Sequence, residues 1–560
     1  MEQSITLKIE YRLKKIYKEN FKEEFVGNIV NLIKRWESKE WRKKDKLSEK
    51  NIYLITYGDS IYEKGVSTLE TLKKFLDENV RDTITDVHLL PMFDYTSDDG
   101  FSVVDYRKIN PKLGNWNNIE ELSKNYRLMF DFVANHMSKS SSWFKRYLNG
   151  EEKYKNYFTA KDKKFDISKV VRPRTSPLYH EYTGKDGTKT AWTTFSEDQV
   201  DLNFQHFPVL EEMTDILIEY AYKGAASIRL DAIGFMWKIS GTSCIHLDET
   251  HEIIKLWRDI LDLLSPNTQI ITETNVPHFE NISYFGDGND EANQVYQFTL
   301  PPLTLFTLTT HNSEKLTAWA KTINSVSETA TFFNFLSSHD GIGLRPVEGI
   351  LTDEEKEMLA QKVLKNGGKI NYKKNVDGTE SPYELNIVYQ DALMNLDEDI
   401  EEEIQIQKIL ASHSILLSFV GVPAIYYHSL LGSRNDYKGL EESGINRRIN
   451  REKLEFSEIT KALKEDSRRS KIFLQTKRLI EIRKNNKAFS PYSPQEVLDL
   501  DFKVFAIKRI NSEEEIICIT NVDSEKIILE TPIKGVDLLS GKTISGKIEL
   551  EPYGISWIKL

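Results

Sequence analysis

The sequence is poor in cysteine. Cys244 and Cys518 are the only two among 560 residues, and neither belongs to a CxxC pair. A disulfide framework and a cysteine-based zinc cluster are therefore not expected. So little cysteine is typical of proteins that work in a reducing compartment, and we expect a cytoplasmic protein.

Long apolar runs and basic stripes are also missing. The opening residues, MEQSITLKIEYRLKK, lack the apolar core of a secretory signal, and the most apolar stretch, 415–427, is short and contains a proline. The formal net charge of -11 accompanies scattered Lys and Arg, so no surface is indicated for a phosphate backbone. We expect neither a membrane nor a nucleic acid as a partner.

Eight short apolar runs of β type alternate with helical patterns along the chain. They are 52–57, 86–91, 128–134, 226–231, 269–273, 294–298, 332–338 and 423–427. This alternation predicts an α/β fold, a (β/α)8 or TIM barrel, whose strands all present their C-terminal ends at one mouth. We assign 51–136 and 204–487 to this catalytic barrel.

Three other segments precede, interrupt or follow the barrel. Residues 1–50 carry apolar side chains at helical spacing from Phe21 to Trp36, which predicts a helical extension packed on the main body rather than on a partner. The interval 137–203 is too long for one crossover and is expected to form an inserted domain after the third strand. Short alternating strands over 488–560 predict an antiparallel C-terminal β domain.

A second long interval, 341–409, follows the seventh strand. It contains the acidic run DEDIEEE at 397–403. Runs of like charge are usually solvated, so we interpret this one as an exposed helix face and not as a binding site.

Two neighbouring strands end in carboxylates. Asp231 closes the fourth apolar run and Glu273 the fifth. Because strand ends in a parallel barrel face one mouth, the two carboxylates are expected to converge on the same pocket. Arg229 precedes Asp231 by two residues, lies on the same face of the strand, and favours its ionised form. Carboxylates of this kind often only form surface ion pairs, but their company here favours a paired-carboxylate enzyme.

Other strand ends supply further polar side chains. Asp98 and Phe101 follow the second strand, His136 the third, and His339 with Asp340 the seventh. Cleavage of a glycosidic bond with retention needs a carboxylate nucleophile and a protonated carboxyl group beside the leaving oxygen. Asp231 fits the first role and Glu273 the second, while the remaining polar groups would hold the ring hydroxyls as the oxocarbenium-like state forms.

Four motifs, DFVANH, SIRLDAIGF, IITETN and FLSSHD, resemble in order and spacing the four characteristic regions of the α-amylase superfamily, family 13 of the glycoside hydrolases. The resemblance covers about 52–560. It implies that Asp231 is the nucleophile, Glu273 the acid/base and Asp340 the transition-state stabiliser. The same resemblance assigns His136, Arg229 and His339 to the glucose subsite -1.

Further stretches, among them HLLPMFDYTSDDGFSVVDYRKINPKLGNW and VVRPRTSPL, resemble the sucrose phosphorylase branch of that superfamily. Phosphate must compete with water for a glucosyl-enzyme, and fixed guanidinium groups bind phosphate bidentately, so arginines near the acceptor suit a phosphorylase. The residues implied by this resemblance are Asp98 and Phe101 at subsite -1, Phe195 and Gln199 as substrate-gripping residues, and Arg174 and Arg447 at the phosphate and acceptor side.

Within this branch the chain looks most like the enzymes that phosphorolyse 2-O-α-D-glucosyl-D-glycerate. Glu384 stands where sucrose phosphorylases more often have Gln, which argues against fructose as the acceptor. We expect a retaining enzyme that uses inorganic phosphate as co-substrate, needs no cofactor, and forms α-D-glucose 1-phosphate and D-glycerate. The alternatives are sucrose, sucrose 6-phosphate or glucosylglycerol phosphorylase, a family 13 hydrolase or transglucosidase, and a catalytically inactive binding subunit. The oligomeric state stays open, with a homodimer among the options.

Metal ligands were also considered. Asn135 matches a calcium-ligand position of many amylases, but the sequence has no further Asp or Asn cluster spaced to supply several oxygen ligands. His246 and His251 are five residues apart, unlike a zinc pair at i and i+4. We expect no essential metal, and core or supporting roles for both histidines.

Overall fold

Eight strands form a closed barrel in the order β1-β18-β14-β13-β12-β11-β6-β3. The computed structural model describes residues 2–374, 379–395 and 401–560. The barrel strands are β1 (Tyr53–Thr56), β3 (Asp86–Leu89), β6 (Arg127–Phe132), β11 (Ala225–Leu230), β12 (Gln269–Thr272), β13 (Gln294–Tyr296), β14 (Thr331–Asn334) and β18 (Val422–Tyr426). Each lies within one of the eight predicted runs or overlaps it to within a residue, and the predicted barrel is confirmed.

Strand β11 shows why these runs are apolar throughout. It pairs in parallel with β6 on one side and with β12 on the other, placing Arg229 opposite Asp131 and Ile271. Every residue of β11 is buried. Strands of parallel sheets are covered on both faces, so a continuous apolar run is expected. The two polar side chains inside this pair, Arg229 and Asp131, must then satisfy each other.

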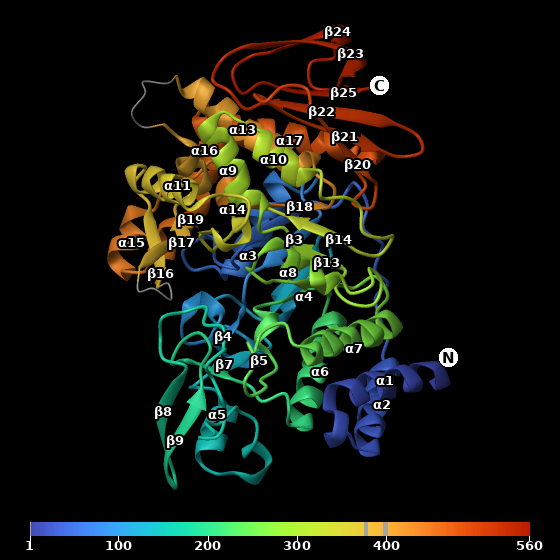
Figure 1. Ribbon diagram of the computed structural model, residues 1–560, viewed down its shortest axis with the longest axis vertical. Helices are drawn as coiled ribbons and strands as arrows, with labels where there is room; N and C mark the ends of the chain where they lie inside the picture. Colours follow the sequence, from blue (N-terminus) through green and yellow to red (C-terminus); the bar gives the residue numbers. More distant parts are fainter. Residues whose placement is uncertain (1, 375–378, 396–400) are drawn as a thin grey trace. The chain divides into compact units, whose positions relative to one another are not determined.

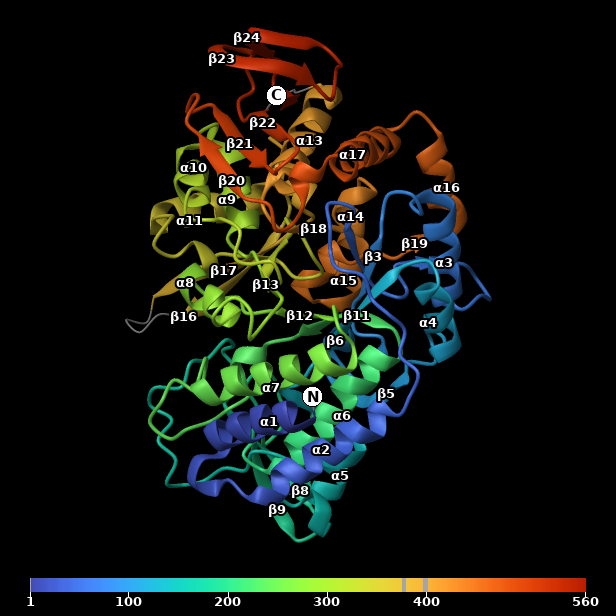
Figure 2. The ribbon, with the colours of Figure 1, turned by 90° about the vertical axis from the view of Figure 1, so that its right-hand side faces the viewer.

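The chain divides into two compact units, coloured along the sequence in Figures 1 and 2. The first comprises Met1–Lys46, His88–Thr274 and Glu280–Val295, and the second comprises Leu47–Val87, Asn275–Phe279 and Tyr296–Leu560. Each unit is described by itself below. The domain boundaries expected from the sequence follow a different criterion and stay predictions.

In the first unit the N-terminal extension forms two helices, α1 (Glu2–Tyr17) and α2 (Glu23–Glu37). They pack on α7 (Asp248–Leu264) and α6 (Phe207–Tyr222), as Figure 2 shows. The ring of Phe25 stacks on that of Phe207 with centroids 4.0 Å apart. Arg12 adds ion pairs of 3.1 Å to both Glu252 and Asp259 of α7. The apolar face of the extension is therefore covered by the chain itself.

The segment between β6 and β11 builds small antiparallel elements in the first unit. A hairpin joins β8 (Tyr179–Gly184) to β9 (Gly187–Trp192), seen in teal in Figure 1. Strand β10 (Gln199–Asp201) pairs with β7 (His136–Ser138) and sets Asp201 opposite His136. This pairing brings two predicted substrate-binding residues, His136 and Gln199, to neighbouring strands.

In the second unit a three-stranded antiparallel sheet follows β14. Its order is β15 (Ile342–Gly343), β17 (Glu380–Asn386) and β16 (Lys369–Lys374), and its register places Glu384 opposite Gly343 and Asn371. The acidic run predicted as a helix face falls partly outside the described residues, at 397–400. Residues 401–403 are exposed, and helix α13 (Glu402–Ser418) begins among them.

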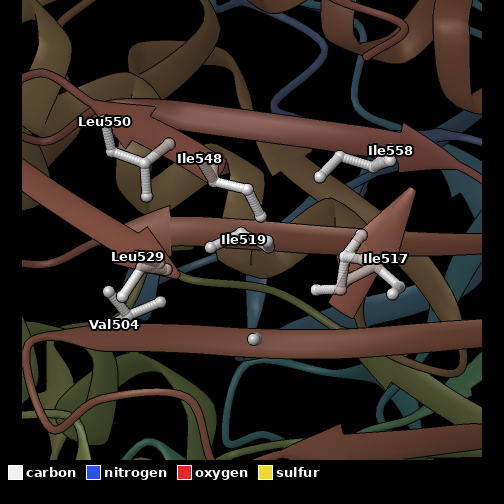
Figure 3. Packing of buried hydrophobic residues seen from close by; sticks show 9 residues of the cluster. Val504, Ile517, Ile519, Leu529, Ile548, Leu550 and Ile558 are labelled. Atoms are coloured by element: carbon white, nitrogen blue, oxygen red, sulfur yellow. The ribbon is translucent and has the colours of Figure 1, made fainter. Parts of the chain in front are cut away.

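The end of the chain forms a six-stranded antiparallel sheet in the order β20-β21-β22-β25-β23-β24. The strands are β20 (Gln495–Leu498), β21 (Val504–Ile510), β22 (Glu515–Asn521), β23 (Ile527–Asp537), β24 (Thr543–Leu550) and β25 (Ile555–Lys559). Figure 3 shows side chains from five of them, including Ile519, Leu529 and Ile548, gathered in one buried cluster. Burial of each such side chain contributes roughly 1.5–3 kcal/mol. The predicted antiparallel C-terminal β domain is confirmed.

Candidate active site

Arg229 links three carboxylates in the first unit. Its Nη1 atom lies 2.8 Å from Oδ1 of Asp231 and 2.5 Å from Oδ1 of Asp131, and its Nη2 atom lies 3.8 Å from Oε1 of Glu273. The Arg229 side chain is only 2% exposed, so its charge is little screened by water. A cation held this close favours the ionised form of Asp231, which a nucleophile requires.

Glu273 is oriented by the backbone that follows Asp231. The amide of Ala232 donates a hydrogen bond of 3.1 Å to Oε2 of Glu273. Ala232 adopts the left-handed conformation, with φ of 48°, which turns its N–H away from the strand direction. Strain of this kind collects at functional sites, and here it fixes the carboxylate relative to the residue after the predicted nucleophile.

Phe101 organises the remaining predicted residues of the first unit. Its carbonyl accepts hydrogen bonds from Nε2 of His136 at 2.9 Å and from Nε2 of Gln199 at 3.3 Å. Gln199 also donates to Oδ2 of Asp98 at 3.2 Å. The ring of Phe101 lies under the guanidinium of Arg229, 5.7 Å from its centroid. Phe195 completes the group through a ring contact of 5.2 Å with His136.

His136 is held as a neutral imidazole. Since a carbonyl only accepts, the bond to Phe101 places the proton on Nε2, and Nδ1 then accepts from the amide of Asn135 at 3.3 Å. Burial lowers the pKa of His136, against the opposing effect of Asp201. Both ring nitrogens are engaged by the protein, so the ring is fixed in place.

Asp131 and His88 were not predicted as site residues. Nε2 of His88 lies 2.7 Å from Oδ2 of Asp131, whose other oxygen accepts from Arg229. Burial lowers the pKa of His88, so the neutral imidazole donates to the carboxylate. Asp131 is the first residue of the DFVANH motif and lies inside an apolar strand, and a charge in such a run was the available signal.

The second unit holds His339 and Asp340 within a group of arginines. Oδ1 of Asp340 lies 2.7 Å from Nη1 of Arg447, and 3.5 Å from Nε2 of His339. Arg451, which was not predicted, donates from Nε to the carbonyl of His339 at 2.8 Å and is 2% exposed. The spacing of the arginines in GINRRINR was its only sequence signal.

Glu384 fixes Arg447. Its Oε1 atom accepts from Nε and Nη2 of Arg447 at 3.0 and 2.9 Å, and from the amide of Gly341 at 2.9 Å. Oε2 accepts from the side chain of Asn371 at 2.9 Å. The Glu384 side chain is 3% exposed, so this is a buried bidentate pair of the stronger kind. The predicted acceptor residues Glu384 and Arg447 are thus brought together.

Twelve of the predicted residues therefore form two groups. In the first unit they are Asp98, Phe101, His136, Phe195, Gln199, Arg229, Asp231 and Glu273, and in the second His339, Asp340, Glu384 and Arg447. Arg174 lies in the first unit, partly exposed, in a segment without regular structure between α5 (Ser142–Leu148) and β8. Its part in a site stays a prediction.

Metal-ligating and membrane-spanning features were also sought in the structure. Over residues 2–374, 379–395 and 401–560, no group of three or more His, Cys, Asp and Glu side chains is placed to hold a metal ion. His246 contacts the hydroxyl of Tyr284 at 2.7 Å, and His251 contacts Glu291 at 2.7 Å, so each has a partner of its own. No helix in the described part of the chain has the length and hydropathy needed to cross a membrane.

Residues 80–363 match the family model described as the catalytic domain of α-amylase. Glucosylglycerate phosphorylase of Escherichia coli (strain K12) is 44% identical over 543 residues, covering 95% of this chain and 96% of the relative. The enzyme of that name from Spirochaeta thermophila is 46% identical and covers 85% and 81%. Sucrose phosphorylase of Streptococcus mutans is 29% identical and covers 73% and 83%.

A solved structure shares the fold. Sucrose 6F-phosphate phosphorylase from Thermoanaerobacter thermosaccharolyticum superposes with a TM-score of 0.75 at 23% identity, covering 89% of this chain and 97% of that one. The family model spans more than half of the 560 residues, and relatives well above 30% identity are matched over most of their length. This chain belongs to the α-amylase family, family 13 of the glycoside hydrolases.

Proposed function

We propose that the protein is a retaining glucosylglycerate phosphorylase, which reversibly converts 2-O-α-D-glucosyl-D-glycerate and phosphate into α-D-glucose 1-phosphate and D-glycerate. The observation that carries the proposal is the arrangement around Arg229. One guanidinium holds Asp231 at 2.8 Å, while Glu273 is anchored separately by the amide of Ala232. Two carboxylates in different surroundings can take different protonation states, which retaining glycoside cleavage requires.

In the first half-reaction Asp231 attacks the anomeric carbon of the glucosyl group, and Glu273 gives its proton to the departing O2 of glycerate. The product is a β-glucosyl ester of Asp231. In the second half-reaction a phosphate oxygen attacks the same carbon from the vacated side, and the Glu273 carboxylate accepts the proton. The Asp231–carbon bond breaks, and two inversions leave α-D-glucose 1-phosphate. Asp340 is proposed to stabilise the positive charge of both transition states.

The acceptor side is proposed to rest on arginine. Phosphate and glycerate are both anions that react with the same glucosyl-enzyme, so a cationic lining serves each of them. Arg447 is oriented by Glu384 and Asp340, with contacts of 2.9 and 2.7 Å, and is fixed before an anion arrives. Glu384 would then affect the choice of acceptor by orienting Arg447. Arg174 is the second proposed anion-binding residue.

The substrate assignment is supported by the names of the relatives. Glucosylglycerate phosphorylases are 44–46% identical to this chain, whereas the sucrose phosphorylases reported so far along the branch are 28–29% identical. No cofactor is proposed besides phosphate as co-substrate. A cytoplasmic location is proposed as well, because Cys244 and Cys518 are buried and unpaired, as suits a reducing compartment.

The test is to incubate the protein with α-D-glucose 1-phosphate and each of D-glycerate, glycerol, fructose, fructose 6-phosphate and water, and to measure phosphate release. Release that is fastest with D-glycerate supports the proposal. Faster release with fructose or glycerol would assign a sucrose or glucosylglycerol phosphorylase. Release that is the same with water alone would indicate a hydrolase.

A further inference from the structure

A lysine ammonium occupies the interior of the first unit beside the predicted glucose-binding residues. Nζ of Lys238 lies 2.7 Å from Oδ2 of Asp201, 2.7 Å from the carbonyl of Phe235 and 3.3 Å from Oδ1 of Asn135. Lys238 is 4% exposed. An ammonium has three donors, and here three oxygen acceptors of different kinds receive them.

The three oxygens belong to segments that carry predicted site residues. Asn135 immediately precedes His136, Asp201 lies two residues after Gln199 on β10, and Phe235 ends the turn that begins after Asp231. The ammonium is therefore the common partner of three separate stretches of chain. The turn residue Phe235 also packs its ring on Phe195, with centroids 5.5 Å apart.

Asp201 extends this connection to a fourth segment. Its carboxylate accepts from the amide of Thr194 at 2.8 Å, from the hydroxyl of Thr194 at 2.6 Å, and from the amide of Asn135 at 3.1 Å. Thr194 immediately precedes Phe195. The carboxylate is fully buried, and a buried charge needs both a counter-ion and hydrogen bonds. Lys238 is the counter-ion, and the segments around it supply the bonds.

The ammonium also acts on the neighbouring histidine. Burial is the main cause that lowers the pKa of His136, Asp201 opposes it, and the charge of Lys238 adds to the lowering. The neutral Nε2–H tautomer, which donates to Phe101, is the form that this environment favours. Loss of the cation alone would leave the charge of Asp201 uncompensated beside His136.

We propose that the ammonium of Lys238 is a positioning group, a cation supplied by the chain itself, which assembles the segments bearing His136, Phe195, Gln199 and Asp231. It follows that truncation of Lys238 leaves an oxygen-lined cavity suited to a small ammonium ion from solution. Ammonium contacts oxygen at about the distances seen here, whereas calcium requires about 2.3–2.6 Å and six or more ligands. The catalytic consequences rest on the proposed function.

The experiment compares Lys238→Ala with Lys238→Met. Both variants lose the charge, but the methionine side chain fills the space of the lysine stem while alanine leaves it empty. Turnover is followed as fluoride release from α-D-glucosyl fluoride, which reports attack by Asp231 whichever acceptor is natural. Each variant is titrated with ammonium and with methylammonium chloride against sodium chloride of equal ionic strength. Lys44→Ala, which truncates a buried lysine held by Ala221, Ser265 and Thr268, is the matched control.

The expected result is a loss of about 100-fold in kcat/KM for both Lys238 variants, because each leaves the Asp201 carboxylate buried without its counter-ion. Ammonium is expected to restore Lys238→Ala by about tenfold or more in a saturable manner, as one-site binding requires, and to leave Lys238→Met and Lys44→Ala unchanged. A purely structural lysine would show no such selectivity.

Several outcomes would overturn the inference. They are parent-like activity of Lys238→Met, rescue of both variants alike, and absence of rescue in a folded Lys238→Ala. If Lys238→Ala does not fold, the double variant Lys238→Ala/Asp201→Asn removes both buried charges, and a parent-like kcat in it would be equally contrary, whereas a low kcat without rescue supports the positioning role. Failure of the proposed function is distinguishable, because the parent would then release fluoride yet form no glucose 1-phosphate from phosphate.

Discussion

Arg229 joins Asp231 to Asp131 through a single nitrogen, with Nη1 2.8 Å from the first carboxylate and 2.5 Å from the second. Asp131 in turn is held by His88 at 2.7 Å. The predicted nucleophile is therefore at the end of a buried chain of polar groups that starts on β3. Since each member is held by its neighbour, Asp231 has little freedom to leave its position, and fixed geometry of this kind lowers the barrier to attack.

Asp231→Asn should retain the fold and lose turnover by several orders of magnitude. An amide cannot form the glucosyl ester, and it keeps the shape and one hydrogen-bond acceptor for Arg229. The measurement is kcat for phosphorolysis, with circular dichroism as the control for folding. Activity close to that of the parent would remove Asp231 from the role of nucleophile.

Glu273→Gln should separate the need for acid from the need for the nucleophile. The variant cannot protonate a poor leaving group such as glycerate, so phosphorolysis of glucosylglycerate is expected to fall by about 100-fold or more. α-D-Glucosyl fluoride needs little acid assistance and should still form the glucosyl-enzyme. Comparison of kcat/KM on the two donors decides the matter, and an equal loss on both would show that Glu273 is not the acid.

Arg447→Ala should weaken the anion side of the site. Loss of a guanidinium at a partly buried anion site costs about 2–4 kcal/mol, so KM for phosphate and for glucosylglycerate should both rise. Slow hydrolysis should persist, because water needs no cation. The ratio of glucose 1-phosphate to free glucose, measured at fixed phosphate, is expected to fall.

The adjacent residue supplies the control for this variant. Arg448→Ala removes an arginine from the same turn, at a position not assigned to the site, and is expected to leave the product ratio unchanged. A ratio that stays constant in Arg447→Ala, or that falls equally in Arg448→Ala, would contradict an anion-binding role specific to Arg447.

The stability of the second unit should depend on pH through His413. Burial lowers the pKa of His413 to about 4, whereas an exposed histidine titrates near 6.5. Between these values the unfolded chain binds a proton that the folded chain excludes, so stability falls as pH decreases, by about 1.4 kcal/mol per pH unit for this group. His413→Asn preserves a partner for Thr476, which lies 2.9 Å from Nδ1.

The measurement is the apparent unfolding temperature at pH 7 and at pH 5. The difference between the two should be smaller in His413→Asn than in the parent. An identical difference in both proteins would show that this histidine does not contribute to the acid sensitivity.

The barrel and its principal carboxylates could be predicted because each leaves a local pattern. The runs that became β11 and β12 are apolar and bounded, and Asp231 and Glu273 stand directly after them. The helical extension was also visible in its spacing, but its division was not, because the break depends on Lys18 taking a positive φ of 49° between α1 and α2.

Other site residues depend on partners far away in the sequence. Lys238 meets Asp201 and Asn135 only when β7 pairs with β10, and His88 meets Asp131 only across neighbouring barrel strands. Glu384 was singled out from its position in a motif, whereas its bond to Arg447 depends on the register of β15 and β17. Patterns along the chain indicate which side chains are available, and long-range pairing decides which of them act through another residue.

The most direct measurement for the account is the NMR spectrum of the first product formed from glucosylglycerate and phosphate. Spectra recorded at early times, before any product can isomerise or be hydrolysed, identify both the phosphate ester and the configuration at its anomeric carbon. Double displacement through Asp231 predicts α-D-glucose 1-phosphate together with D-glycerate. β-D-Glucose 1-phosphate, or free glucose as the main product at saturating phosphate, would contradict a retaining phosphorylase.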